Sequence, residues 1–574
     1  MKEKSQPQHP VSTLGRIRLW CIGHMTTCCL FVIIVLASAL RFYNIAHNPP
    51  SMYWDENALA YDAYSILKTG KDHHGNPYPI VAFPSFGDYK PGGYIYAIVP
   101  FEALFGLNSF ATRLPSALSG IIAVVCLFFI GKELVDERLG LMASFLYAVQ
   151  PWSLQFSRAG FEVNMATMLL TVGALCLLRS RKHQWVLVPS ILFFVLSMYT
   201  YQAARVFAPL MGIVAGVLLL IYWLRSKISW KKWVIPSIAT TIVAFLCIAP
   251  IVLNLHSATV NERLAEVGIF TDLNPIVQSN ALIAQYHHAL WARLVFHRDI
   301  FFFILIVKQW ITFFSPSFLF LRGDGNLRHS TDVFGLLYQI EAIFIGAGLL
   351  AFLFSLFCYQ KLPSWFKLSS KQKQLVTLCL VWIAIAAIPG AMATPVPHGL
   401  RFLLASPAFA LISAFGLLKL VESRWKWQLN IRRIIVVGAL GVSITSYLWY
   451  YQTVYPMKAS ADWQYGYTQM YNAVFADKKA NEQVYVTTQE GRPSMYYFVA
   501  SHYDPSTLQQ KGPSLPKNQL EIIGIDDYHF VDQVNGSMRG LFATALNQVD
   551  PKANVLDTIK RLDGSVVWVI WRRE

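Results

Sequence analysis

Charge is scarce in this sequence. Only 14% of its 574 residues are Asp, Glu, Lys or Arg, whereas 55% are hydrophobic. A soluble globular chain carries about 25% charged residues. The composition therefore excludes an ordinary soluble enzyme and predicts a polytopic α-helical membrane protein.

Cysteine is missing from the long segments expected to lie outside the membrane. All eight cysteines fall in or at the edges of apolar runs, so neither a disulfide framework nor a cysteine zinc site is predicted. We also find no repeat, low-complexity tract, Gly-rich phosphate loop or zinc-protease motif. The motifs of soluble enzymes thus do not assign a function.

Apolar runs of about 20 residues recur along most of the chain and match the thickness of a hydrocarbon core. They predict about eleven membrane spans, near 20–43, 110–131, 139–157, 162–178, 184–202, 206–224, 233–253, 334–358, 375–393, 401–421 and 434–453. The membrane domain is accordingly expected to extend from 20 to 454.

The net charge of +16 is distributed as short basic clusters between apolar runs, such as 132–138 and 225–232. This pattern indicates cytoplasmic turns and not a nucleic-acid surface. It places the N-terminal segment 1–19 in the cytoplasm. Alternation then puts three segments outside: the loop 44–109, the loop 254–333 and the tail 455–574.

A further apolar run at 300–321 would reverse this alternation if it crossed the membrane. It contains Lys308, Gln309 and the Ser315-Pro316 step, which are unfavourable against lipid. We therefore predict that it is re-entrant or lies along the outer face.

The tail has the pattern of a small α/β domain. A helix is predicted from Trp463 to Lys478, and strands are predicted at 483–488, 520–525 and 565–571.

The stretch MYWDENALAY at 52–61 places Asp55 and Glu56 side by side, shortly after the first apolar run. Adjacent carboxylates repel each other and resist desolvation. Two interpretations are open. Asp55 is either a solvated N-cap of the following helix, or the pair has a chemical role.

Two later motifs favour a chemical role. The same outer loop ends in DYKPGGY, where Lys90 precedes an aromatic, apolar helix. The next outer edge carries PWSLQFSRAGFEVNM, where Arg158 and Glu162 are spaced one helical turn apart at the mouth of a span.

The order of span, acidic pair, Lys-Pro, RLPSAL, GLMASFLYAVQPW and SR followed by Glu resembles the GT-C superfamily of lipid-dependent glycosyltransferases. Within it, the sequence is similar to the family 39 protein O-mannosyltransferases and the lipid A aminoarabinose transferases, mainly over 20–210. The resemblance implies that Asp55 is catalytic, with Glu56 as its partner, and that Lys90 contacts the donor phosphate. Arg158 and Glu162 match an Arg and an acidic residue of the family, which usually has Asp at the second position.

Glycosyl transfer requires a carboxylate that takes the acceptor proton and cations that hold the leaving phosphate. Beyond Lys90 and Arg158, candidate cations at outer edges are Arg205 and Arg401. Snorkelling to the interface is the alternative for both. Nearby Tyr201 and His398 fit either an interfacial aromatic belt or a sugar-phosphate pocket.

The segment 321–335 concentrates four polar side chains before the next span, and we predict that it forms a pocket wall, although a plain polar turn would also fit. These side chains are Asp324, Asn326, Arg328 and His329. No compelling ligand spacing is found among histidines such as His287, His288 and His297. No metal ligand is assigned, and a divalent metal is left open.

These observations predict an integral-membrane glycosyltransferase of a bacterial or archaeal cell membrane. It would move a sugar from a polyprenyl-phosphate donor to an extracytoplasmic acceptor, which is a protein hydroxyl, lipid A or an envelope glycan. The expected partners are donor, acceptor and membrane lipid, with no nucleic acid. A transporter or flippase of such lipids is the alternative, disfavoured because no inverted repeat is found. A non-catalytic assembly protein is a third possibility.

Overall fold

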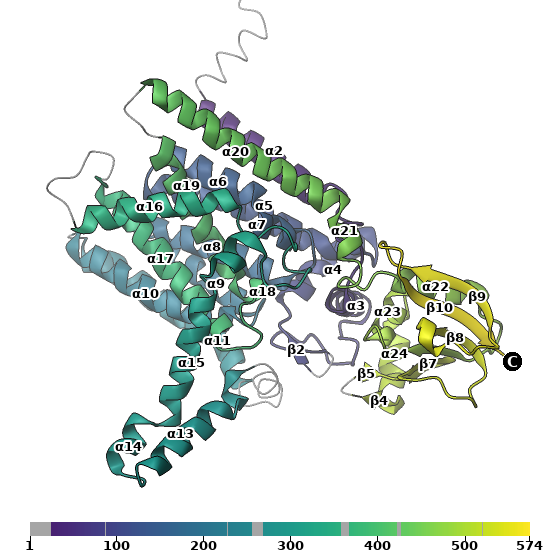
Figure 1. The fold of residues 1–574 in the computed structure, drawn as a ribbon. Helices are drawn as coiled ribbons and strands as arrows, with labels where there is room; N and C mark the ends of the chain where they lie inside the picture. Colours follow the sequence, from purple (N-terminus) through teal and green to yellow (C-terminus); the bar gives the residue numbers. More distant parts are fainter. Residues whose placement is uncertain are drawn as a thin grey trace, which may run out of the picture.

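The computed structural model describes residues 24–85, 88–226, 228–254, 268–357, 367–421, 426–518 and 521–574. The N-terminal segment 1–19, Cys21 and Cys358 lie outside these residues. The described part consists of a helical bundle followed by a smaller domain that contains a sheet (Figure 1).

All eleven predicted spans coincide with helices. In the described ranges, nine helical stretches are long and apolar enough to cross a membrane: α2 (Met25–Phe42), α5 (Ser109–Leu134), α8 (Glu162–Arg179), α10 (Ala204–Arg225), α11 (Trp230–Leu253), α16 (Gln339–Phe357), α17 (Ser370–Ala391), the run Gly399–Val421, and Ile431–Thr453 within α20 (Lys426–Thr453). The run Gly399–Val421 comprises α18 (Gly399–Phe402), η5 (Leu403–Ala405) and α19 (Ser406–Val421). The remaining two predicted spans are shorter helices, α6 (Glu137–Val149) and α9 (Leu187–Met198), the latter preceded by η1 (Gln184–Val186).

Burial divides the bundle into inner and peripheral helices. In the apolar stretch of the run Gly399–Val421, 83% of the residues are buried, and in that of α5 the share is 72%. In α2 and α11 it is only 17%. Helices whose backbone groups bond internally can expose apolar side chains to lipid. The apolar surface of α2, α11 and α20 is thus the surface that a bilayer would cover.

The predicted span 139–157 is two helices. Gln150 ends α6 in an extended conformation, and α7 (Pro151–Ser157) begins at the next residue. The residue before a proline is disfavoured in the helical region, which explains the break. Arg158 then ends α7 and Glu162 begins α8, so the expected spacing of these two residues on one helix is wrong.

The run 300–321 does not form one continuous helix. Helix α15 (Arg298–Thr312) ends within it, and η3 (Ser317–Leu321) follows a turn. Together with α13 (Asn274–Gln285) and α14 (Leu290–Val295), α15 extends away from the bundle (Figure 1). Its C-terminal end is joined to α17 by Trp310, whose Nε1 donates to the Ala384 carbonyl. Whether the segment enters the membrane stays a prediction.

The short elements after α2 are α3 (Trp54–Thr69), β1 (Phe83–Ser85), β2 (Asp88–Lys90) and α4 (Gly93–Phe105). They lie at the end of the bundle that faces the smaller domain (Figure 1). The N-cap of α3 is Tyr53, and Asp55 stands in the first turn, so the interpretation of Asp55 as an N-cap is wrong.

The C-terminal domain is built on a six-stranded sheet with the order β6-β7-β3-β8-β10-β9. Strand β3 runs parallel to β7 and β8, and the other neighbours are antiparallel. The strands are β3 (Val484–Thr487), β6 (Gly524–Ile525), β7 (Tyr528–Val531), β8 (Gly540–Thr544), β9 (Asn554–Lys560) and β10 (Val566–Arg573). The predicted α/β character is confirmed.

Two predicted elements of the tail differ in detail. The strand expected at 520–525 is split, because β5 (Glu521–Ile522) pairs with β4 (Lys517–Asn518) in a separate ribbon and only β6 joins the main sheet. The predicted helix from Trp463 to Lys478 begins later, as α22 (Tyr467–Asp477), which follows α21 (Tyr455–Lys458) and Gly466 at φ 117°.

Helices α23 (Pro493–Ala500) and α24 (Pro505–Lys511) pack against α3. One buried apolar cluster contains Ala58, Ala60 and Tyr61 of α3 together with residues of α22, α23 and the sheet. The hydroxyl of Tyr61 also donates to the Tyr503 carbonyl at 2.8 Å. The C-terminal domain therefore forms part of the support of α3.

Candidate active site at the start of α3

Asp55 lies in the first turn of α3, where the positive end of the helix dipole favours a carboxylate. The preceding residue is held by the C-terminal domain, because the Trp54 N–H donates to Oε1 of Gln464 at 3.0 Å. The Asp55 side chain is 27% exposed. It is thus a fixed carboxylate that remains accessible.

Glu56 points elsewhere, although it is the next residue. Its side chain is fully buried and accepts from Nε of Arg113 at 2.9 Å, from a terminal nitrogen of Arg113 at 3.0 Å and from the Gly160 N–H at 2.7 Å. This pair joins α3 to α5 and to the α7–α8 connection. The structure therefore supports a positioning role for Glu56 and keeps it away from a substrate.

Arg113 was not among the predicted site residues. It also donates to the carbonyls of Ile45, Pro49 and Ser51, so one guanidinium organises the whole segment between α2 and α3. A sequence signal existed, since an arginine near the start of an apolar helix requires a partner. The sequence did not indicate that the partner is Glu56.

Lys90 ends the β1–β2 hairpin and lies between two acids. Its Nζ is 2.5 Å from Oδ1 of Asp55 and 3.9 Å from Oε1 of Glu162, the first residue of α8. The side chains of Lys90 and Glu162 are 13% and 11% exposed. Asp55, Lys90 and Glu162, hereafter the acid–lysine cluster, thus come from three separate elements.

The two glycines after Lys90-Pro91 allow the hairpin to approach its neighbours. A Cβ on Gly93 would lie 2.6 Å from Oγ1 of Thr200, and a Cβ on Gly92 would lie 2.7 Å from the Phe83 ring. The Gly93 N–H donates to the Tyr199 carbonyl, and Nε2 of Gln202 donates to the Tyr89 carbonyl. The α9–α10 connection therefore fixes the position of Lys90.

A polar cavity of about 180 Å³ adjoins this cluster. It is lined by side chains from the hairpin, the start of α8, the α9–α10 connection and the region around α18, including Tyr89, Lys90, Glu162, Tyr201, Gln202 and Arg401. Asp55 adjoins it through its ion pair with Lys90. The structure thus brings together four of the predicted residues, namely Lys90, Glu162, Tyr201 and Arg401, with Asp55 beside them.

Two predicted phosphate ligands do not line this cavity. Arg158 is 1% exposed and donates to the carbonyls of residues 40, 41, 43 and 48. Arg205 donates to the carbonyls of Met198 and Val81. Both arginines satisfy backbone acceptors, which indicates structural roles. Arg401 also donates to the Thr394 and Pro395 carbonyls, yet it reaches the cavity.

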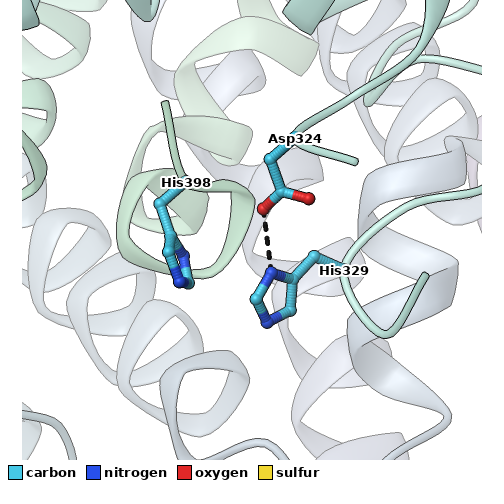
Figure 2. A group of neighbouring side chains, drawn as sticks. All are labelled: Asp324, His329 and His398. Carbon is cyan, nitrogen blue, oxygen red and sulfur yellow. Dashed lines mark hydrogen bonds and ion pairs between the residues drawn. The ribbon is translucent and has the colours of Figure 1, made fainter. Parts of the chain in front are cut away.

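The segment 321–335 forms a second group beside the first. Oδ2 of Asp324 accepts from Nδ1 of His329 at 2.8 Å and from the Gly399 N–H at 2.7 Å, and His398 lies against His329 (Figure 2). Arg328 stacks over Tyr53 and Trp54, directly before Asp55. Asn326 accepts from the Arg328 N–H and shapes the turn. The loop thus contacts the residues leading into α3, but none of its four predicted side chains, nor His398, lines the polar cavity, so their role as a pocket wall stays a prediction.

Electrostatics keep two rings of this region neutral. Burial, reinforced by the charges of Asp55 and Glu162, raises the pKa of Tyr53 well above its usual value. Burial and the neighbouring His329 lower the pKa of His398 to about 2. The phenol and this imidazole are therefore uncharged at neutral pH.

A larger, apolar cavity of about 640 Å³ lies between α9, α10 and α11. Its lining includes Phe194, Met198, Ala208 and Trp233, and most of its surface is apolar. Met198, at the end of α9, and Ala208, near the start of α10, line the apolar cavity. Tyr201 and Val206, which lie between them in the sequence, line the polar cavity. Polar and apolar spaces thus succeed each other along α10.

The fold and the site define a polytopic helical membrane protein with a polar cluster at one end of its bundle and a small α/β domain. Residues 90–253 match the family model described as dolichyl-phosphate-mannose-protein mannosyltransferase. This match bears out the resemblance to GT-C glycosyltransferases over that part of the chain, and the apolar helices and the C-terminal sheet of the structure bear out the helical membrane fold with a small α/β domain. It begins at Lys90, so Asp55 and Glu56 lie outside it.

A curated relative, the putative mannosyltransferase YycA of Bacillus subtilis (strain 168), is 23% identical over 214 residues, which are 35% of this chain and 28% of that protein. The chain thus matches little more than a quarter of this relative's length.

The solved structures that are similar include the following two. The oligosaccharyltransferase AglB of Archaeoglobus fulgidus, in complex with an inhibitory peptide and a dolichol-phosphate, has 14% identity and a TM-score of 0.47, with 84% of this chain and 64% of that chain covered. ArnT of Cupriavidus metallidurans bound to undecaprenyl phosphate has 13% identity and a TM-score of 0.41, with 94% and 97% covered.

Proposed function

We propose that this protein is an integral-membrane glycosyltransferase that transfers a sugar from a polyprenyl-phosphate donor to an acceptor hydroxyl at the α3 end of the bundle, on the extracytoplasmic side. The observation that carries the proposal is the acid–lysine cluster beside a polar cavity, with an apolar cavity further along α10. The match of residues 90–253 to a lipid-phosphate-dependent mannosyltransferase family supports it.

The two cavities suit the two parts of a lipid-linked donor. The apolar cavity between α9, α10 and α11 offers dry walls for an isoprenoid chain, which gains free energy from burial in proportion to its apolar area. The polar cavity offers Lys90 and Arg401 to the phosphate and Tyr201 to the sugar. Charge-assisted hydrogen bonds from such cations stabilise the phosphate as it becomes the leaving group.

Asp55 is proposed as the general base. Transfer requires that the acceptor hydroxyl lose its proton as its oxygen attacks the anomeric carbon, while the lipid phosphate leaves with the bonding electron pair. Lys90 holds the Asp55 carboxylate at the cavity and carries the positive charge between that acid and the donor site. Glu162 is proposed to orient Lys90 from the other side.

Replacement of Asp55 by Asn tests this proposal. The amide preserves shape but does not accept a proton, so transfer should fall by about 10²–10⁴-fold. The measurement is label transfer from a panel of radiolabelled polyprenyl-phosphate sugars by purified full-length protein in detergent. Asp557→Asn, at an exposed position of the edge strand β9 in the C-terminal domain, serves as the matched control and should retain transfer. Near-normal turnover of Asp55→Asn, with the same thermal stability as the wild type, would rule out the general base.

A further inference from the structure

The loop between η3 and α16 and the segment before α18 bring three metal-binding side chains together. Asp324, His329 and His398 each offer one ligand atom, and these atoms all lie within 4.8 Å of one another (Figure 2). The side chains of Asp324 and His329 are 3% and 7% exposed. Of the three residues, His329 is buried and Asp324 and His398 are half-buried, and an aspartate with two histidines forms a donor set typical of zinc.

One possible metal-ligand atom of the cluster is buried and takes part in no hydrogen bond. Asp324 is bonded to His329 and to the Gly399 N–H, but Nδ1 of His398 is buried and has no partner. A buried polar atom without a partner is unfavourable and calls for an explanation. The ring of His398 lies against that of His329, and this ring contact gives Nδ1 of His398 no hydrogen bond.

The spacing is close to that of a bound ion. Ligand bonds of about 2.0–2.2 Å in tetrahedral geometry place neighbouring ligand atoms about 3.3 Å apart. Nδ1 of His329 and Oδ2 of Asp324 are already 2.8 Å apart. A shift of about 1.5 Å by the side chain of His398 would bring its ligand atom to the distance that a shared ion requires. Arg322 and Gly325 of the same loop are exposed, so the loop that carries Asp324 and His329 lies at the surface.

We propose that Asp324, His329 and His398 bind one divalent transition-metal ion of the zinc class. Binding replaces the hydrogen bond between His329 and Asp324: His329 ligates through Nδ1 and carries its proton on Nε2, and Asp324 ligates as a carboxylate. The ion fastens the loop that carries Arg328 to the segment that carries Arg401. These two arginines flank the residues before Asp55 and the polar cavity, so the site positions the wall of the pocket without contacting the reacting atoms.

The test measures metal binding directly and does not depend on any transfer activity. Purified full-length protein in detergent is stripped with a chelator, dialysed and titrated with Zn²⁺, and bound zinc is quantified by mass spectrometry. We expect one equivalent per chain. His398→Ala should weaken binding by at least about 100-fold, since even supporting residues of metal sites change affinity by up to that factor.

A double variant, His287→Ala with His288→Ala, is the control for exposed histidines and should retain the equivalent. Without zinc, His398→Ala loses the contact of the His398 ring with His329 but no hydrogen bond at Nδ1, so its melting temperature should fall by less than the rise that zinc gives the wild type, and zinc should give this variant no rise. Absence of stoichiometric zinc in the wild type, or its loss in the double variant only, overturns the proposal. A lower melting temperature of stripped His398→Ala with unchanged zinc binding also overturns it.

Discussion

Asp55 and Glu56 are adjacent, yet their surroundings predict different effects of mutation: loss of stability at the buried Glu56 and loss of transfer at the accessible Asp55. Replacing Glu56 by Gln removes the charge that compensates Arg113 while keeping the shape. The five N–H groups of Arg113 are all used, two of them by Glu56. In the variant, the amide oxygen can still accept one of these bonds, but the amide nitrogen would face a guanidinium nitrogen with donors on both sides.

The expected loss of stability is about 3–5 kcal/mol, because removing one partner of a buried ion pair leaves an uncompensated charge. Asp55→Asn is the matched control, since it makes the same chemical change one residue away. Its carboxylate is part of a partly exposed pair, where the contribution to stability is about 1 kcal/mol or less. The variants should therefore separate: Glu56→Gln loses stability, and Asp55→Asn loses transfer.

The assay is equilibrium unfolding of detergent-solubilised variants in a titration with denaturing detergent, together with the apparent melting temperature. Arg113→Ala and the variant with both residues replaced complete a double-mutant cycle, in which the two changes should be far from additive. A Glu56→Gln protein within about 0.5 kcal/mol of the wild type would contradict the assignment of a buried, stabilising pair.

Three further predictions concern the phosphate site, the topology and the α3–β1 loop. Lys90→Ala should weaken binding of polyprenyl phosphate by about 1.5–3 kcal/mol, measured by calorimetry; unchanged affinity would leave Lys90 as a partner of the acids only. Single cysteines at Gln285 and Asn326, in a chain without its native cysteines, should both react with an impermeant thiol reagent in intact cells, and protection of either one would refute the outer placement of 254–333. Burial tends to lower the pKa of His73, but the ion pair with Asp62 outweighs it and raises that pKa above about 6.5. The pair thus stabilises the fold fully below about pH 6.5 and less as pH rises through the pKa of the folded state. In melting experiments, His73→Asn should therefore be more destabilising at acidic than at alkaline pH. An equal effect at both would contradict the ion pair.

The helices were largely predictable, because the length of an apolar run directly reflects a helix that spans lipid. Within the residues that the structure describes, each of the eleven predicted spans contains a helix. The deviations occur where proline or a loop overrides hydropathy, as at Gln150-Pro151 and at the late start of α16 at Gln339. The run 300–321 also looked continuous by composition, although a turn interrupts it after Thr312.

The candidate site was only partly predictable. The sequence placed Asp55, Lys90 and Glu162 at the outer ends of predicted elements, but the ion pair of Lys90 with Asp55 and its approach to Glu162 were not predicted. The direction in which a side chain points was not available from the sequence. Arg158 resembles a phosphate ligand by position, yet it turns inward to backbone carbonyls. The proximity of His398 to Asp324 depends on tertiary packing, so no local spacing could reveal it.

The shared apolar cluster of α3 and the C-terminal domain has a consequence for biosynthesis. Helix α3 is synthesised well before most of the residues that cover Ala58, Ala60 and Tyr61, which lie within 467–570. Until they arrive, the helix that bears Asp55 has an uncovered apolar face and no bond from Gln464 to its first turn. The bundle is thus inserted before α3 is fully supported, and a chain interrupted in the tail would keep the contacts that hold Lys90 and Glu162 but lose those that the C-terminal domain makes to the helix of Asp55.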